Sequence, residues 1–128
     1  MKFFSADLAE GIAADITDQL NAVASEFPDA KTTILMSGSP TTGLFIADKH
    51  LAGGDLAVEM RRTLPARHSF LNQKTSPLHL AADLRAAITG KVLTLMCKDG
   101  KIFLPCHQRV FAINYETSAS VEFSVVVR

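Results

Sequence analysis

The chain has 128 residues, 48% of them hydrophobic, and its 13 basic side chains balance its 13 acidic ones. That is enough apolar material for one compact domain spanning 1–128. The zero net charge and the lack of basic runs argue against a nucleic-acid-binding surface and against a membrane-surface role. No stretch has the pattern of a signal peptide or a membrane span, which predicts a cytoplasmic protein.

The first 48 residues predict a strand, a helix and two further strands. Apolar residues recur every three or four positions in the helix, and either Asp15 or Thr17 is suited to cap its N-terminus. This apolar stripe consists of Ile12, Ile16, Leu20, Val23 and Phe27. The strands are predicted at 2–4, 32–36 and 44–47, with a hydroxyl-rich loop at 37–43.

Two more helices are predicted in the middle of the chain. Asp55 is placed to cap the first, whose apolar stripe is Leu56, Met60 and Leu64. Ser76 and Pro77 form a strong start for the second helix, and Gly90 suits its C-terminus. The stripe that this helix is expected to bury consists of Leu80, Leu84 and Ile88.

Everything after Lys91 has the pattern of strands joined by short turns, and Asp99-Gly100 suits a two-residue hairpin turn. The strands are predicted at 91–97, 101–103, 107–116 and 121–127. Helices early and strands late predict an α+β domain with an antiparallel meander in its C-terminal half and about three helices. The last strand is so apolar that an edge position would require cover from a neighbouring subunit.

The stretch LPCHQRVF, at 104–111, places a thiol, an imidazole, an amide and a guanidinium in a predicted strand. Alternation puts Cys106 and Gln108 on one face and His107 and Arg109 on the other. One pair is expected to line a polar cavity, and the other pair an interface or a sheet surface.

The two cysteines, Cys97 and Cys106, flank the predicted hairpin. In the hairpin's register their sulfurs lie far apart, which predicts two buried, reduced thiols and no disulfide.

Three further histidines lie in different settings. His50, in a polar loop, has the pattern of a solvated side chain, and His68 follows the end of a helix. His79 lies about a quarter-turn from the expected core stripe of its helix, and Asp83, four residues on, is placed to orient its ring. A surface ion pair accounts for the same spacing, so both interpretations stay open.

The tract from Leu78 to Phe111 resembles the C-terminal half of the YjbQ-like family, usually described as secondary thiamine-phosphate synthase. Asp15-Ile16-Thr17 is similar to the family's Asp-Ile-Thr opening, and 39–44, SPTTGL, is similar to its Pro-His-Thr-Thr-Ala-Leu loop. His68 falls where the family has a Tyr-x-His. The positions that match are Thr41, Thr42, His68, His79, Asp99, Gly100, Gln108 and Arg109.

Four departures from the family pattern bear on function. Pro40 stands where the family has a loop histidine, and His107 stands where it has a tryptophan. Thr75 replaces an asparagine, and Asp48 replaces a glutamate. Proline can neither bind a metal nor transfer a proton, so one histidine is missing from its usual place.

The resemblance implies a homotrimer with pockets between its subunits, and a small anionic or phosphorylated ligand. The implied reaction joins a pyrimidine diphosphate to a thiazole phosphate and releases pyrophosphate, normally with Mg²⁺. The catalytic residues that it implies are His68, His79 and Gln108. The ligand-binding residues that it implies are Thr41, Thr42, His107 and Arg109.

Two alternatives stay open. The first is a non-catalytic structural or ligand-binding trimer with a decayed active site, which Pro40 favours. The second is a metal-binding protein in which His68 and His79 hold a divalent ion and Asp83 orients one of them. The sequence lacks the Asp-rich cluster of a dedicated diphosphate–Mg²⁺ site, which favours weak activity.

Overall fold

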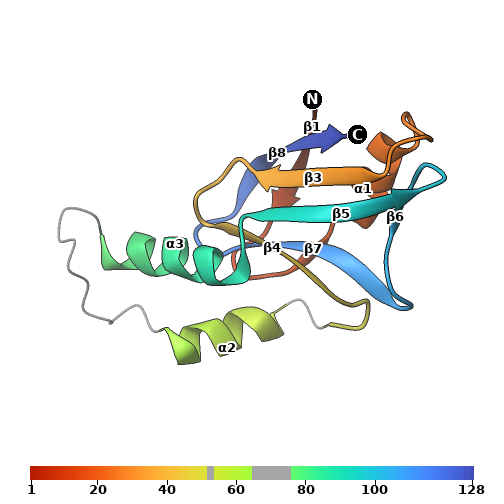
Figure 1. The fold of residues 1–128 in the computed structure, drawn as a ribbon. Coiled ribbons are helices and arrows are strands. Elements are labelled where there is room, and N and C mark those ends of the chain that lie inside the picture. The colour runs from red at the N-terminus through yellow and green to blue at the C-terminus, as the bar shows by residue number, and fades with distance from the viewer. Residues whose placement is uncertain (52–53, 65–75) are drawn as a thin grey trace.

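The computed structural model describes residues 1–51, 54–64 and 76–128, which form two antiparallel sheets and three helices (Figure 1). The larger sheet has, in spatial order, β1 (Lys2–Leu8), β8 (Ala119–Val127), β3 (Thr32–Ser37), β5 (Val92–Lys98) and β6 (Lys101–Phe103). The smaller sheet has β2 (Ala14–Asp15), β7 (Gln108–Asn114) and β4 (Thr42–Asp48). The helices are α1 (Thr17–Ala24), α2 (Asp55–Thr63) and α3 (Pro77–Thr89). The predicted α+β class is confirmed.

Strand β7 contributes to two separate groups of buried residues. Val110 and Ala112 belong to the main core, together with the inner face of the larger sheet and the apolar side of α1. Ile113 belongs to a second cluster with Ala57 of α2 and Ala86 of α3. Because alternate side chains of a strand point to opposite faces, β7 and the smaller sheet separate the main core from α2 and α3. None of the helices in the described ranges combines the length and hydropathy needed to cross a bilayer.

The C-terminal strands are antiparallel as predicted, but they divide between the two sheets and do not follow one another as a meander. Only β5 and β6 form a hairpin, and its turn residues Asp99 and Gly100 both have positive φ, as a type I′ turn requires. Strand β8 lies between β1 and β3, with Phe123 stacked on Phe4. The last strand is therefore not at an edge and needs no cover from a neighbouring subunit, because β1 and β3 pair with it on both sides.

The stretch that begins with Cys106 and His107 differs from its predicted form. Both residues lie in an exposed turn, and β7 begins only at Gln108. Both thiols are free, as predicted, but only Cys97 is partly buried, with its sulfur 2.7 Å from Thr33 Oγ1. The prediction of two buried thiols is therefore wrong for Cys106.

Helix α1 is shorter than its apolar stripe suggested. Ala14–Asp15 pairs with β7 as a strand, and Ile12 and Phe27 lie outside the helix and are exposed. An Asp15 carboxylate oxygen accepts the backbone N–H of Thr17 at 2.9 Å, at the start of the helix. At α2, Gly54 occupies the N-cap position and Asp55 is the first helical residue.

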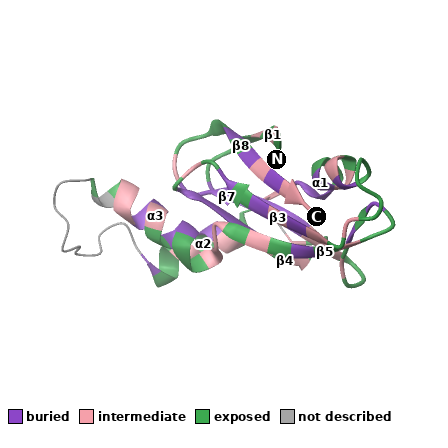
Figure 2. Cartoon of the chain, turned by 45° about the horizontal axis from the view of Figure 1, so that its top comes forward, coloured by how far each residue is buried: buried purple, intermediate pink, exposed green. Residues whose placement is uncertain are grey.

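Helix α3 buries a different face from the one predicted. Its buried side chains are those of Ala81, Ala82, Arg85 and Ala86, whereas Leu84 is 40% and Ile88 is 58% exposed (Figure 2). Ser76 caps the helix as predicted, since its hydroxyl accepts the His79 N–H at 3.2 Å. Small residues on the buried face let the helix backbone lie close to the sheet, and this turns the predicted leucine stripe outward.

A cation joins α3 to α2. The Arg85 Nε and Nη2 atoms donate to the Leu64 carbonyl oxygen at 3.1 and 2.7 Å, at the C-terminus of α2. Removal from water, and then the nearby charge of Arg61, lower the pKa of Arg85. The negative end of the α2 dipole offsets part of the cost of burying this charge.

Helix α3 lies very close to the smaller sheet at Gly43. A Cβ atom on this residue would lie 2.7 Å from the Cβ of Thr89, too close for an unstrained contact. We expect Gly43→Ala to lower the free energy of unfolding by about 1–3 kcal/mol, since the added methyl group overpacks the contact. Urea denaturation followed by circular dichroism measures this.

A matched variant is Gly54→Ala, because a Cβ there meets nothing within 4 Å. Its effect should stay below about 1 kcal/mol, the typical value of a helix N-cap change. Equal stabilities of the two variants would contradict the close packing of α3.

Candidate functional site

His79 lies in the first turn of α3. Its ring is held by a carboxylate two residues beyond the C-terminal end of β7. The His79 Nδ1 atom lies 3.0 Å and 3.2 Å from the two carboxylate oxygens of Glu116. Both side chains are partly exposed, at 33% and 38%. The predicted partner, Asp83, instead forms an ion pair with Lys91. The interpretation of Asp83 as the orienting residue is wrong, because the face of α3 that meets the sheet is not the predicted one.

Asn114 connects Glu116 to the hydroxyl-rich loop. Its side-chain oxygen accepts the Glu116 N–H at 3.2 Å and the Thr41 hydroxyl at 2.8 Å, and its amide donates to the Thr117 carbonyl at 2.9 Å. The backbone N–H of Tyr115 also donates to the Thr41 carbonyl oxygen. Loop 38–41 is thus hydrogen-bonded to the C-terminal end of β7, next to Glu116, the partner of His79.

Sequence reasoning did not identify Asn114 or Glu116. Nothing in the local pattern distinguishes them from other polar residues at the end of a strand. The pairing of Thr42 with Asn114 in the β4–β7 register is what brings them to the loop.

Thr41 and Thr42 are buried in the chain, with exposed fractions of 3% and 0%. The Thr41 hydroxyl supports the loop, and the Thr42 hydroxyl has no hydrogen-bond partner among the described residues. An unpaired buried hydroxyl typically costs about 1–3 kcal/mol. Both residues are therefore buried within the single chain.

Gln108 and Arg109 lie at the opposite end of β7 from Asn114. Six residues of strand correspond to about 20 Å, at roughly 3.3 Å per residue. Within the single chain, therefore, the structure does not bring Gln108 or Arg109 to His79. His107, in the turn before β7, lies at the same distant end. His68 falls outside the described residues, so its approach to His79 stays a prediction.

Arg109 is held by two carboxylates. Its Nε donates to Asp15 Oδ2 at 2.7 Å, and its Nη2 donates to Asp18 Oδ1 at 3.0 Å. These hydrogen bonds satisfy two of its N–H groups, and the two carboxylates offset its positive charge. In this arrangement Arg109 offers little net charge to an anionic ligand.

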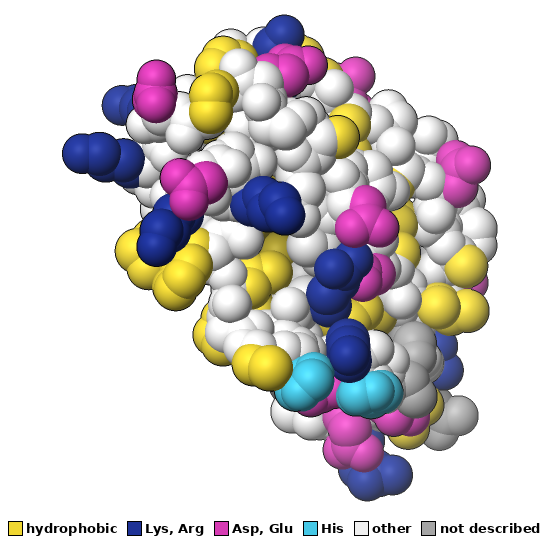
Figure 3. Space-filling view, turned by 90° about the vertical axis from the view of Figure 1, so that its right-hand side faces the viewer, with side chains coloured by type: hydrophobic (Ala, Val, Ile, Leu, Met, Phe, Trp, Pro, Cys, Tyr) yellow, Lys and Arg dark blue, Asp and Glu magenta, His cyan; other side chains and the backbone are white. Residues whose placement is uncertain are grey.

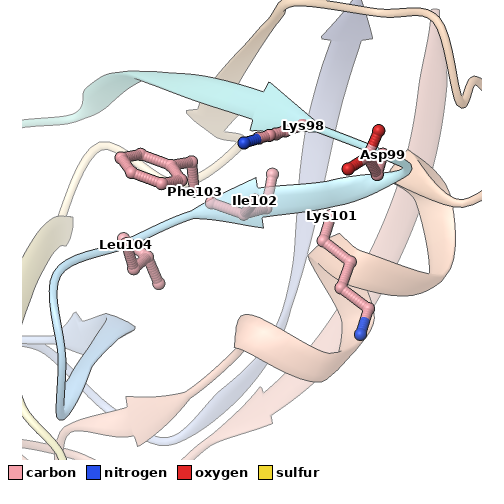
Figure 4. A pocket seen from close by; sticks show the side chains of 6 residues that line it. All are labelled: Lys98, Asp99, Lys101, Ile102, Phe103 and Leu104. Atoms are coloured by element: carbon pink, nitrogen blue, oxygen red, sulfur yellow. The ribbon is translucent and has the colours of Figure 1, made fainter.

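A surface hollow of about 530 Å³ lies beside the β5–β6 hairpin (Figure 4). Its lining residues are Lys98, Asp99, Lys101, Ile102, Phe103 and Leu104. Lys98 and Lys101 are cross-strand partners, but Figure 4 shows the Lys101 side chain directed away from Lys98. None of the predicted site residues lines this hollow, and its charged groups do not converge.

The Asp15–Arg109 pair predicts a pH dependence of stability. Burial raises the pKa of Asp15, but hydrogen bonds from Arg109 and Thr17 outweigh it, so the pKa lies below 3.8 in the folded chain. A carboxyl group whose pKa is lowered by folding stabilises the protein above its unfolded pKa, and this contribution is lost as the pH falls through its folded pKa.

We therefore expect Arg109→Gln to lower the free energy of unfolding at neutral pH by up to about 1 kcal/mol, since the pair is partly exposed. The difference from the parent should shrink at acidic pH, as the pH falls through the lowered folded pKa of Asp15. Urea denaturation at both pH values measures it. Arg62→Gln, which removes the exposed pair with Glu59, is the control. A difference for Arg109→Gln that stays constant with pH would contradict the assignment.

The chain matches no protein-family model and no curated protein, but its fold matches solved structures. An uncharacterised conserved protein of the YjbQ/UPF0047 family from Clostridium acetobutylicum has a TM-score of 0.86 at 14% identity, covering 100% of both chains. A YbjQ-like protein of unknown function from Sulfolobus solfataricus P2 has a TM-score of 0.85 at 14% identity, covering 98% of this chain and 94% of its own. A conserved hypothetical protein from Thermus thermophilus has a TM-score of 0.81 at 21% identity, covering 100% of both chains. The chain therefore has the fold of YjbQ/UPF0047 proteins.

Proposed function

We propose that the chain is a divergent YjbQ-like protein that binds a small anionic or phosphorylated molecule at His79. The observation that carries this proposal is the Glu116 carboxylate, which holds the Nδ1 side of the ring. With Nδ1 engaged, Nε2 is the nitrogen left for a ligand. This nitrogen can donate to a phosphate oxygen or take up a proton, according to its protonation state.

The position of His79 on its helix supports an anionic ligand. The first turn of α3 carries no acidic side chain. The positive end of the dipole at a helix N-terminus favours negative charge nearby. A ligand phosphate beside His79 would therefore meet a favourable field from the N-terminus of α3 and a hydrogen-bonding nitrogen of the imidazole.

A thiamine-phosphate synthase-like reaction is the activity that we propose to test, and we expect it to be weak. Pro40 cannot supply the proton transfer that a loop histidine would supply. Arg109 is committed to two aspartates and is poorly placed to offset the charge of a leaving pyrophosphate. Among the described residues, no group of three or more His, Cys, Asp or Glu side chains is arranged to hold a metal ion, so we derive no step through Mg²⁺.

We also propose a homotrimer with ligand pockets between subunits. Gln108 and His79 lie at opposite ends of the smaller sheet in one protomer, so a second copy would be needed to bring them together. The outward stripe of α3 offers an apolar surface for such a contact, with Leu84 and Ile88 both well exposed. The zero net charge adds little repulsion between copies.

The alternative of a non-catalytic trimer is favoured by two observations. Pro40 replaces a family histidine, and the Thr41 and Thr42 hydroxyls are buried. The alternative of a metal site on His68 and His79 rests on a residue outside the described ranges. Turnover with the two thiamine precursors separates the enzyme from the first alternative, and metal analysis of the purified protein tests the second.

We expect His79→Gln and Glu116→Gln each to reduce thiamine-phosphate formation by about 10²-fold or more, because positioned proton transfer is typically worth about 10²–10⁴-fold. Pro40→His should raise the activity, and Pro40→Ala separates the effect of a freer backbone from that of the imidazole. Steady-state turnover and pyrophosphate binding by calorimetry are the measurements.

Glu122→Gln, at an exposed position on β8, is the matched control and should leave both measurements unchanged. Substantial parental turnover that none of the four variants alters would show that the chemistry lies elsewhere. A parent without turnover that still binds pyrophosphate through His79 would identify the non-catalytic binding protein.

Sedimentation should give a mass three times the 13.8 kDa of one chain at micromolar concentration. We expect the double variant Leu84→Asp and Ile88→Asp to sediment as a monomer, because two charges would have to be desolvated in the contact. Val58→Asp, at an exposed position on α2, should leave the trimer intact. A parent chain that sediments as a monomer would refute this assembly.

A further inference from the structure

The side chain of Asn114 closes the turn that follows β7. Its amide nitrogen donates to the Thr117 carbonyl oxygen at 2.9 Å, and its oxygen accepts the Glu116 N–H at 3.2 Å. An asparagine that hydrogen-bonds to its own backbone two or three residues on fixes such a turn locally. Only 3% of Asn114 is exposed. A buried side chain therefore holds the backbone from which the Glu116 carboxylate reaches His79.

The hydroxyl of Thr41 fixes the orientation of this amide. It donates to the Asn114 side-chain oxygen at 2.8 Å, because an amide oxygen only accepts hydrogen bonds. The Ser39 hydroxyl lies 3.2 Å from the Thr41 hydroxyl oxygen, and it is the donor there, since the Thr41 proton is already engaged. The Thr41 hydroxyl therefore has no proton left to donate to a ligand.

The contact with Glu116 decides which nitrogen of His79 carries the proton. An ionised carboxylate only accepts hydrogen bonds, so the His79 Nδ1 atom, 3.0 Å from Glu116 Oε1, is the donor. In the neutral ring Nε2 then has no proton and presents a lone pair. If Glu116 moved away from Nδ1, the ring would be free to take either tautomer.

The opposite end of the molecule is a different kind of surface. Figure 3 views the chain from the end that carries β6 and the start of β7, where Lys and Arg side chains lie among Asp and Glu side chains. Arg109, for example, is held by Asp15 and Asp18. Charges of both signs offset each other there, whereas the hydrogen bonds of Thr41 and Asn114 lead to a single imidazole.

We propose that Asn114 is the positioning residue of the His79 site, and that it makes the tautomer of His79 depend on loop 38–41. The loop orients the amide through Thr41, the amide holds the backbone of Glu116, and Glu116 holds the ring. This inference rests on the proposed function for its consequence on ligand binding. The tautomer itself is a property of the chain without a ligand.

Proton–nitrogen NMR spectra of the full chain without ligand test the positioning, because the ring nitrogen shifts of a histidine report which nitrogen is protonated. His79→Gln identifies the signals of this ring. We expect the neutral ring of the parent to carry its proton on Nδ1. Asn114→Ala and Thr41→Val should each give the signals of mixed tautomers, as should Glu116→Ala. Thr41→Ser keeps the hydroxyl and should retain the parental signals.

Calorimetric titration with pyrophosphate measures the consequence for a ligand. We expect the affinity to be about 3–10-fold lower in Asn114→Ala and in Thr41→Val, the typical effect of one lost hydrogen bond, and parental in Thr41→Ser. Thr94→Val, at an exposed position on β5, is the matched control and should leave the ring signals and the affinity unchanged. Circular dichroism checks that each variant is folded.

The proposal is overturned if the His79 nitrogen shifts of folded Asn114→Ala and Thr41→Val equal those of the parent. It is also overturned if Thr41→Ser departs from the parent as far as Thr41→Val does. If Asn114→Ala does not fold, the two Thr41 variants decide the question. Altered ring signals in the variants of a parent that binds no pyrophosphate would support the positioning and refute the ligand proposed for His79.

Discussion

The close contact between α3 and the smaller sheet is the constraint on which the candidate site depends. Gly43 has no side chain, so Thr89 packs directly against the β4 backbone. The alanine face of the helix then packs against β7, and this packing sets the rotation of α3 about its own axis. That rotation turns His79 toward Glu116 and leaves Asp83 to pair with Lys91. A different packing face would give His79 a different partner.

Strand β7 separates two groups of candidate functional residues, one at each of its ends. At one end, Asn114 ties the hydroxyl-rich loop to Glu116 and His79. At the other end, Arg109 is paired with the aspartates at the start of α1, and the exposed turn carries His107. A strand cannot bend these ends together, because its residues advance by about 3.3 Å each. Within a single chain, the residues at the two ends therefore do not form one compact site.

The positive charges of Arg109 and Arg85 are compensated by different kinds of group. Arg109, at the surface, is compensated by two carboxylates, whereas the buried Arg85 is compensated by the C-terminal carbonyl of α2. The first arrangement removes a cation that family resemblance would assign to ligand binding. The second uses a cation for packing, so neither of these two arginines is free to offset the charge of an anionic ligand at His79.

The resemblance to the YjbQ-like family, drawn from partly kept motifs, anticipated the fold that the solved structures share with this chain. Turn chemistry and helix caps were also readable from the residues: Asp99-Gly100 forms the hairpin turn, and Ser76 caps α3. These features depend on neighbours within a few residues, so local sequence contains the information.

Periodicity alone predicted the wrong buried face of α3. The stripe that ends at Leu84 and Ile88 is the more hydrophobic one, and burial normally favours it. The helix face that meets the sheet, however, is rich in alanine, which suits the close approach at Gly43. The sequence of a helix does not specify the surface against which the helix packs. The sequence likewise left open whether the last strand lies at an edge, because strand order is a long-range property.

By itself, the sequence determined the α+β class, most of the helices and strands, the hairpin turn and the histidines that deserve testing. Only the tertiary structure decided that His79 is held by Glu116, which lies 37 residues away, and that Gln108 lies far from both. It also placed His107 beside the turn of His50. Such pairings depend on strand register and on which helix face packs, and both follow from the free energy of the whole folded chain and not from any local segment.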